Sequence, residues 1–140
     1  MTKQIKTSIT INASRQKTWE ILTDFEKYSD WNSFIKSVSG EVIVGNRIKV
    51  KLQGMIFKPV VMTFKENIEF KWLGHLLYKG LFDGEHRFYL TDNEDGSVNF
   101  EQSENFSGIL VNLFSKSLDK NTRNGFEQMN KELKVLAEKH

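Results

Sequence analysis

The segment FDGEHRFYLTDNEDGSVNFEQSENF, residues 82–106, predicts a β-hairpin and with it the class of fold. Apolar and polar residues alternate in 82–90 and again in 97–106, which is the period of a strand with one buried face. The linking residues TDNEDG are typical of a tight turn between antiparallel strands. The segment therefore predicts that the chain is built around an antiparallel sheet.

The first strand of this hairpin carries a histidine on its apolar face. Successive side chains of a strand point to opposite faces, so His86 lies with Phe82 and Phe88 while Glu85 points the other way. The adjacent residues Glu85 and His86 therefore do not form a catalytic pair. Two interpretations of His86 stay open, a core histidine hydrogen-bonded to a neighbour or a residue of a ligand site.

The second strand also carries polar residues on its apolar face. Gln102 and Glu104 share this face with Phe100 and Phe106. Burying a carboxylate is costly unless it is paired, hydrogen-bonded, protonated or hydrated. Two registers are open: His86 lies opposite Gln102 in one and, after a shift of two residues, opposite Glu104 in the other. Either register predicts a polar cluster in a row of phenylalanines, which serves a pocket or forms a structural network.

The segments before the hairpin predict five further strands and two short helices. Residues 5–11 alternate like a half-buried strand. Helical spacing in 14–25, with Ser14 as the N-cap, predicts a short helix, and 26–35 predict a second short helix or tight bend in which Asn32 stabilises the turn. The remaining alternation predicts strands at about 38–44, 47–52, 60–64 and 68–72.

The last third of the chain predicts one long helix. In residues 110–136 the apolar side chains recur three or four positions apart, with polar residues between them. Ser107 is the predicted N-cap, and Gly125 interrupts the apolar stripe.

Length and composition exclude several classes of function. At 140 residues the chain fits a single domain spanning residues 1–140. The 20 Lys and Arg nearly balance the 18 Asp and Glu and are scattered, so nucleic acid is not an expected partner. With no cysteine and three histidines without metal-ligand spacing, neither a metal site nor another cofactor is expected. No apolar stretch approaches the ~20 residues of a membrane span, so we expect a cytoplasmic protein; its oligomeric state is unknown.

Four motifs resemble one known superfamily in order and spacing. They are YSDWNSF at 28–34, LFDGEHRFYL at 81–90, FEQSENFSGIL at 100–110 and TRNGFEQMNKELK at 122–134. The chain thus resembles the SRPBCC or START-like superfamily, in its polyketide cyclase/dehydrase-like branch. The resemblance implies an α+β helix-grip fold, in which a curved seven-stranded antiparallel sheet wraps around a long C-terminal helix and two short helices follow the first strand. Ser33 departs from the family signature, which has proline at this position and so a more rigid turn.

The resemblance also implies a deep apolar cavity between the sheet and the long helix. Proteins of the superfamily use this cavity for lipids, polyketides or other hydrophobic small molecules. Gly125 is expected to leave room for such a ligand. The candidate ligand-binding residues are the aromatic and polar residues of the apolar sheet face with their neighbours: Trp31, Phe34, Phe64, Phe70, Trp72, Phe82, His86, Phe88, Phe100, Gln102, Glu104, Phe106, Gly125 and Met129.

Three functions follow as hypotheses. The first is a binding protein that encloses one hydrophobic small molecule. The second is a cyclase or dehydratase-type enzyme, a lyase or isomerase, that uses His86 and Glu104 for proton transfer. The third is an accessory or chaperone-like module, which would require an exposed apolar patch. Residues 74–80, which include His75, are expected to form an exposed loop or an apolar rim at the mouth of the cavity.

Overall fold

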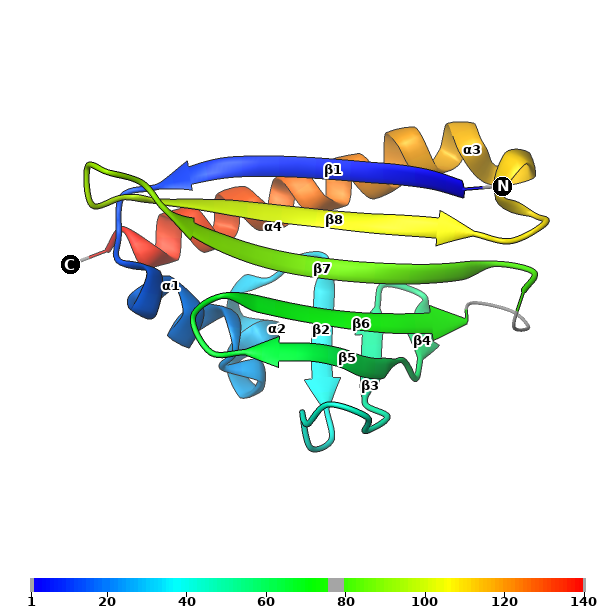
Figure 1. The fold of residues 1–140 in the computed structure, drawn as a ribbon, viewed down its shortest axis with the longest axis horizontal. Helices are drawn as coiled ribbons and strands as arrows, with labels where there is room; N and C mark the ends of the chain where they lie inside the picture. Colours follow the sequence, from blue (N-terminus) through cyan, green and yellow to red (C-terminus); the bar gives the residue numbers. More distant parts are fainter. Residues whose placement is uncertain (1, 76–79, 140) are drawn as a thin grey trace.

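The computed structural model describes residues 2–75 and 80–139 and shows one large antiparallel sheet. Its five strands lie in the order β1-β8-β7-β6-β5 (Figure 1). The bounds of these strands are Thr2–Ile11 for β1, Val60–Lys65 for β5, Glu69–His75 for β6, Asp83–Asp92 for β7 and Val98–Ser107 for β8. The chain therefore has the predicted α+β fold with an antiparallel sheet.

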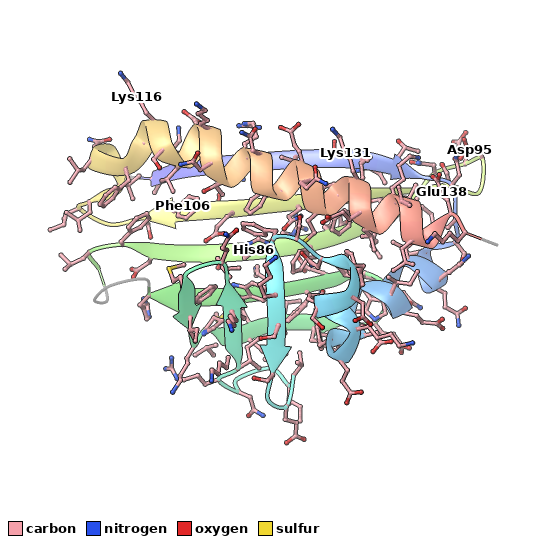
Figure 2. The ribbon with its side chains drawn as sticks, turned by 180° about the vertical axis from the view of Figure 1, so that it is seen from behind. His86, Asp95, Phe106, Lys116, Lys131 and Glu138 are labelled. Atoms are coloured by element: carbon pink, nitrogen blue, oxygen red, sulfur yellow. The ribbon has the colours of Figure 1, made fainter. Side chains whose placement is uncertain are left out.

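A second, smaller sheet lies behind the large one. It contains the strands in the order β2-β3-β4, with bounds Ile35–Ser39, Lys49–Leu52 and Met55–Phe57. These strands cross β5, β6 and β7 on the same face of the large sheet that the C-terminal helix covers (Figures 1 and 2). The described strands thus form two sheets, whereas a single sheet of seven strands was predicted.

The small sheet corrects two details of the prediction. The predicted strand 38–44 ends as β2 at Ser39, because Gly40 adopts a positive φ of 103° and turns the chain. The strand β4 was not predicted, since its three residues are too few to show a period. It pairs with β3 through a turn at residues 53–54, where Gly54 has a φ of 77°.

The C-terminal helix runs as three consecutive segments. They are α3 at Val111–Ser117, the π-helical η2 at Leu118–Thr122 and α4 at Arg123–Ala137. The predicted long helix is confirmed, but its predicted N-cap is wrong. Ser107 is the last residue of β8, and Leu110 stands at the N-cap without a side-chain hydrogen bond. Wide π turns of this kind occur preferentially at functional sites.

The two predicted short helices follow β1. They are α1 at Arg15–Leu22 and, after the 3₁₀ turn η1 at Phe25–Lys27, α2 at Tyr28–Trp31. Ser14 caps α1 as predicted, because its hydroxyl oxygen accepts from the backbone N–H of Lys17. The predicted role of Asn32 is also confirmed: its Oδ1 accepts from the backbone N–H groups of Phe34 and Ile35, at 3.0 and 2.8 Å.

Ser33, the residue that departs from the family signature, holds the turn after α2 against α4. The backbone N–H and the hydroxyl of Ser33 both donate to Glu132 Oε1 on α4, at 3.0 and 2.9 Å. A proline at this position has neither donor. The turn is therefore held to the long helix by two hydrogen bonds in place of a fixed φ angle.

The hairpin of β7 and β8 adopts the second of the two predicted registers. His86 lies opposite Glu104, and Gly84 lies opposite Phe106. The observed pairs are centred on residue 95, whereas the first register is centred on residue 94, and this difference of one residue shifts every pair by two. The histidine and the carboxylate therefore face each other directly across the strands.

Gly125 of α4 makes room for an aromatic ring of the protein itself. A Cβ atom at position 125 would lie 2.6 Å from Cδ1 of Phe34. The Phe34 ring also packs edge to face on Phe126, with 5.4 Å between the ring centroids. The prediction that Gly125 leaves space for a ligand is therefore wrong, because Phe34 fills that space.

The contact between Gly125 and Phe34 predicts a background-dependent effect of Gly125→Ala. In the wild type the new methyl group should displace the Phe34 ring, and overpacking of this kind costs about 1–3 kcal/mol. In a Phe34→Leu background the crowding is relieved, so Gly125→Ala should stabilise the protein by up to about 1 kcal/mol through helix propensity. Urea unfolding of the four proteins measures both effects. Equal effects of Gly125→Ala in the two backgrounds would contradict the assignment.

Candidate ligand-binding pocket

A cavity of about 360 Å³ lies where the large sheet, the small sheet and η2 meet. Three groups of residues form its wall. The large sheet and the residue before β7 contribute Trp72, Phe82, His86, Glu104 and Phe106. The small sheet and the residue before it contribute Phe34, Ile35, Leu52, Met55 and Phe57. The helical segments α3 and η2 contribute Phe114, Leu118 and Thr122.

Most of this wall is apolar, and two of its side chains are more than a third exposed. Met55 and Phe114 are 38% and 37% exposed, so they mark the mouth of the cavity. Next to Phe114 on the chain, Ile109 and Leu113 are both 75% exposed. The mouth is therefore bordered by apolar side chains, which were not apparent as an exposed patch from the sequence.

The polar end of the cavity is formed by Glu104, His86 and Thr122. Figure 2 shows His86 in the space between α4 and β2, with Phe106 farther along the sheet toward α3. The His86 side chain is 3% exposed and that of Glu104 is 13% exposed. The carboxylate, rather than the imidazole, is therefore the polar group that is more open to the cavity.

Gly84 leaves the space that the carboxylate of Glu104 occupies. A Cβ atom on Gly84 would lie 2.2 Å from Oε2 of Glu104. A glycine within a strand often marks such a close approach of another group. Within the described residues Oε2 has no hydrogen-bond partner, whereas Oε1 lies 2.8 Å from Nδ1 of His86.

A chain of hydrogen bonds leads from this carboxylate into the core. Nε2 of His86 lies 2.9 Å from Oε1 of Gln102, and Nε2 of Gln102 donates to Oδ1 of Asn130 at 2.8 Å. Nδ2 of Asn130 donates to the hydroxyl oxygen of Thr7 at 2.9 Å. The Thr7 hydroxyl donates to the backbone carbonyl of Gln102, also at 2.9 Å. The five side chains join β1, β7, β8 and α4.

The last bond of this chain fixes the direction of all the others. A backbone carbonyl only accepts, so the Thr7 hydroxyl must donate to it and must accept from the amide nitrogen of Asn130. Oδ1 of Asn130 then accepts from the amide nitrogen of Gln102, which leaves the amide oxygen of Gln102 facing His86. Nε2 of His86 therefore carries a hydrogen atom.

The same reasoning places a proton between His86 and Glu104. With Nε2 protonated, a neutral imidazole has only a lone pair at Nδ1, and a lone pair facing an ionised carboxylate oxygen at 2.8 Å would repel it. One proton must therefore lie between Nδ1 and Oε1. The pair is either imidazolium with carboxylate or neutral imidazole with carboxylic acid, and it carries no net charge in either form.

Aromatic rings hold the imidazole in this orientation. The His86 ring stacks on Trp72, with 4.9 Å between centroids and an interplanar angle of 20°. Phe126 packs edge to face on it at 4.9 Å, and Phe88 lies at 4.6 Å. Because both ring nitrogens are engaged by protein groups, His86 offers no free nitrogen to a molecule in the cavity.

Six of the predicted ligand-binding residues line the cavity: Phe34, Trp72, Phe82, His86, Glu104 and Phe106. Seven of the others belong to the packing beside it. Phe70, Phe88, Phe100 and Met129 are buried in the main core, and Trp31 and Phe64 pack against that core. Gln102 is fully buried behind His86. The structure therefore places these seven residues, like Gly125, outside the cavity wall, and their direct contact with a ligand stays a prediction.

Seven residues of the wall were not predicted: Ile35, Leu52, Met55, Phe57, Phe114, Leu118 and Thr122. Those of the C-terminal helix belong to the predicted apolar stripe, but the sequence did not show that they face the cavity. Those of β3 and β4 could have been found only by placing the small sheet over the large one. Asn130 was missed as well, although a polar residue four positions after the buried Phe126 is a detectable signal.

Part of the predicted rim lies outside the described residues. This applies to residues 76–79. Next to them, Nδ1 of His75 lies 2.6 Å from Oδ1 of Asp83, whose carboxylate also accepts from the backbone N–H of Gly80.

Among residues 2–75 and 80–139, no three His, Cys, Asp or Glu side chains gather as they would around a metal ion. In the same part of the chain, no helix combines the length and the apolar character needed to cross a membrane.

Solved structures with similar folds come from several sources. Hypothetical protein jhp0584 from Helicobacter pylori has a TM-score of 0.82 and 14% identity, with 96% of this chain and 88% of that chain covered. A START superfamily protein from Mycobacterium smegmatis has a TM-score of 0.70 and 20% identity, with 96% and 97% covered. The di-domain ARO/CYC StfQ from the steffimycin biosynthetic pathway has a TM-score of 0.78 and 11% identity, with 99% and 51% covered. At these identities the likeness shows the fold alone.

No curated protein sequence matches the chain. A model of the family described as "Polyketide cyclase / dehydrase and lipid transport" matches residues 2–139. Because this match covers nearly the whole chain, the protein belongs to the polyketide cyclase/dehydrase and lipid transport family.

Proposed function

We propose that the protein binds one hydrophobic small molecule in the cavity and orients the molecule's polar group toward Glu104. The observation that carries this proposal is the composition of the cavity wall, which is apolar except for Glu104, His86 and Thr122 at one end. A largely apolar cavity with a few convergent polar groups is the usual form of a small-molecule site. Its volume of about 360 Å³ falls in the range of about 300–1,000 Å³ that such sites occupy.

Affinity in such a site comes mainly from apolar area removed from water. The rings of Trp72, Phe82, Phe106 and Phe57 present a continuous apolar surface to the ligand. These side chains are held by neighbours; Trp72, for example, packs on Phe70 and Phe57. A ligand therefore meets a wall that is already ordered, which limits the entropic cost of binding.

The geometry favours binding over catalysis. In the enzyme hypothesis His86 and Glu104 transfer protons, but both ring nitrogens of His86 are engaged by Gln102 and Glu104. Of this pair only Oε2 of Glu104 is open to a substrate, and the described wall presents no charged side chain besides the pair to stabilise a developing charge. A binding function needs neither a free base nor such a group. The family includes both kinds of protein by its description.

Filling the cavity should abolish binding without harming the fold. Leu52 lines the cavity from β3 and is only half buried, so Leu52→Trp can place its larger side chain in the cavity. With the apolar dye N-phenyl-1-naphthylamine as the probe, we expect Leu52→Trp to weaken binding at least about 10-fold, equal to about 1.4 kcal/mol. Met62→Trp is the matched control, since Met62 is an exposed residue of β5 outside the wall; it should bind the dye as the wild type does.

Thermal unfolding separates a filled cavity from a damaged fold. Without dye, Leu52→Trp should unfold at or above the wild-type temperature, because its ring occupies empty space. Dye at about 100 times its Kd should stabilise the wild type by about 2.7 kcal/mol and leave Leu52→Trp unchanged. Undiminished dye binding by a stable Leu52→Trp protein would place the binding site elsewhere.

A further inference from the structure

The shared proton between His86 and Glu104 restricts the kind of polar group that the cavity accepts. This inference rests on the proposed function and adds the chemical class of the ligand. The proton lies on the Oε1 side of the carboxyl group, because Oε1 is the atom next to Nδ1 of His86, at 2.8 Å. The other oxygen, Oε2, lies above Gly84 and has no partner within the described residues.

Oε2 is an acceptor in both possible forms of the pair. In the ionic form the proton is on Nδ1, and Oε2 belongs to a carboxylate. In the neutral form the proton is on Oε1, where it is donated to Nδ1, and Oε2 is the carbonyl oxygen of a carboxylic acid. A carboxyl group donates only through its single O–H, and that O–H is occupied by His86 in the neutral form.

The direction of this pair cannot simply reverse. With one proton in the pair, a donor at Oε2 would leave Nδ1 of His86 and Oε1 of Glu104 facing each other without a proton between them. Reversing the imidazole would set Nε2 without a hydrogen against the amide oxygen of Gln102, whose amide nitrogen is held by Oδ1 of Asn130 and by the backbone carbonyl of Phe126, at 2.8 and 3.5 Å. Buried unpaired groups of this kind cost about 1–3 kcal/mol each.

We therefore infer that the natural ligand is an apolar molecule with a neutral hydrogen-bond donor, a hydroxyl group, and not a carboxylate or an acceptor-only carbonyl or ether. The hydroxyl donates to Oε2 of Glu104. An anionic headgroup would meet the lone pairs of Oε2, and the only free donor that the described wall offers it is the neutral hydroxyl of Thr122. An ammonium group would lose its hydration and gain little, because the His86–Glu104 pair has no net charge. Long-chain carboxylates are accordingly poor ligands, and hydroxylated ring compounds are good ones.

A matched series of naphthalenes tests the inference by displacement of N-phenyl-1-naphthylamine. The probes are 2-naphthol, 2-methoxynaphthalene, 2-naphthoate and 2-naphthylmethylammonium, which share one ring system and differ in the polar group. In the wild type we expect 2-naphthol to bind at least about 10-fold more tightly than each of the others, the effect of one hydrogen bond to a charged or polarised acceptor. Tighter or equal binding of the ether, the anion or the cation would overturn the inference.

Two variants of Glu104 sharpen the test. Glu104→Leu in a His86→Phe background removes Oε2 and also the Nδ1 lone pair that Glu104→Leu alone would leave free to accept, so the preference for 2-naphthol over 2-methoxynaphthalene should fall to within about 2-fold. Glu104→Gln should keep the preference, because its amide nitrogen must donate to Nδ1 of His86 and its amide oxygen then takes the place of Oε2. A preference that survives Glu104→Leu in the His86→Phe background, or is lost in Glu104→Gln, would contradict the proposed direction of the network.

The outcomes distinguish this inference from the proposed function. If neither the dye nor any naphthalene binds to the wild-type protein, the proposed function is wrong and the inference falls with it. If all four naphthalenes bind equally well, the cavity is a binding site and only the inference is wrong.

Discussion

The hydrogen bond from the Thr7 hydroxyl to the backbone carbonyl of Gln102 determines how the interior of this protein is arranged. A carbonyl oxygen has no hydrogen to give, so this one contact sets which atom donates in each of the following bonds. Reversing any single bond would leave a buried donor or acceptor without a partner, and the low polarity around it makes that costly. The orientation of the cavity-facing carboxylate of Glu104 thus depends on a hydroxyl group of the neighbouring strand β1.

The same network also joins the elements that enclose the cavity. Asn130 belongs to α4, while Thr7, His86 and Gln102 belong to neighbouring strands of the large sheet. Asn130 is 2% exposed and Gln102 is fully buried, so both amides depend on each other for hydrogen bonds. The helix can therefore pack on the sheet in one register only. Apolar contacts supply most of the stability, and the polar chain selects among the packings that such contacts allow.

Much of this arrangement was predictable from the sequence, because strand period and helix period are strong signals. The hairpin and the C-terminal helix follow from these periods. The cluster of His86, Gln102 and Glu104 follows from polar residues that interrupt an apolar row. The register of the hairpin could not be predicted, since the two registers differ by two residues and so place the same side chains on the same face. Only the geometry of the turn distinguishes the two registers, and the amino-acid composition of the turn allows both.

The cavity itself was less accessible to sequence reasoning. Its wall combines the large sheet with β3, β4 and η2, which lie far apart along the chain, and the way a short sheet crosses a long one leaves no periodic pattern. Gly125 illustrates the difficulty. A missing side chain indicates that something approaches closely, but the sequence does not say whether that is a ligand or, as here, the ring of Phe34.

One measurement tests most directly whether Nε2 of His86 carries hydrogen, on which the acceptor role of Glu104 depends. Two-dimensional ¹H–¹⁵N spectra of protein labelled at the histidine ring nitrogens report which nitrogen of each imidazole carries hydrogen, and the His86→Phe variant identifies the signals of His86. We predict that at neutral pH Nε2 of His86 carries hydrogen, with or without a second hydrogen at Nδ1. A neutral His86 with hydrogen at Nδ1 alone would contradict the direction of the network and with it the acceptor role of Glu104.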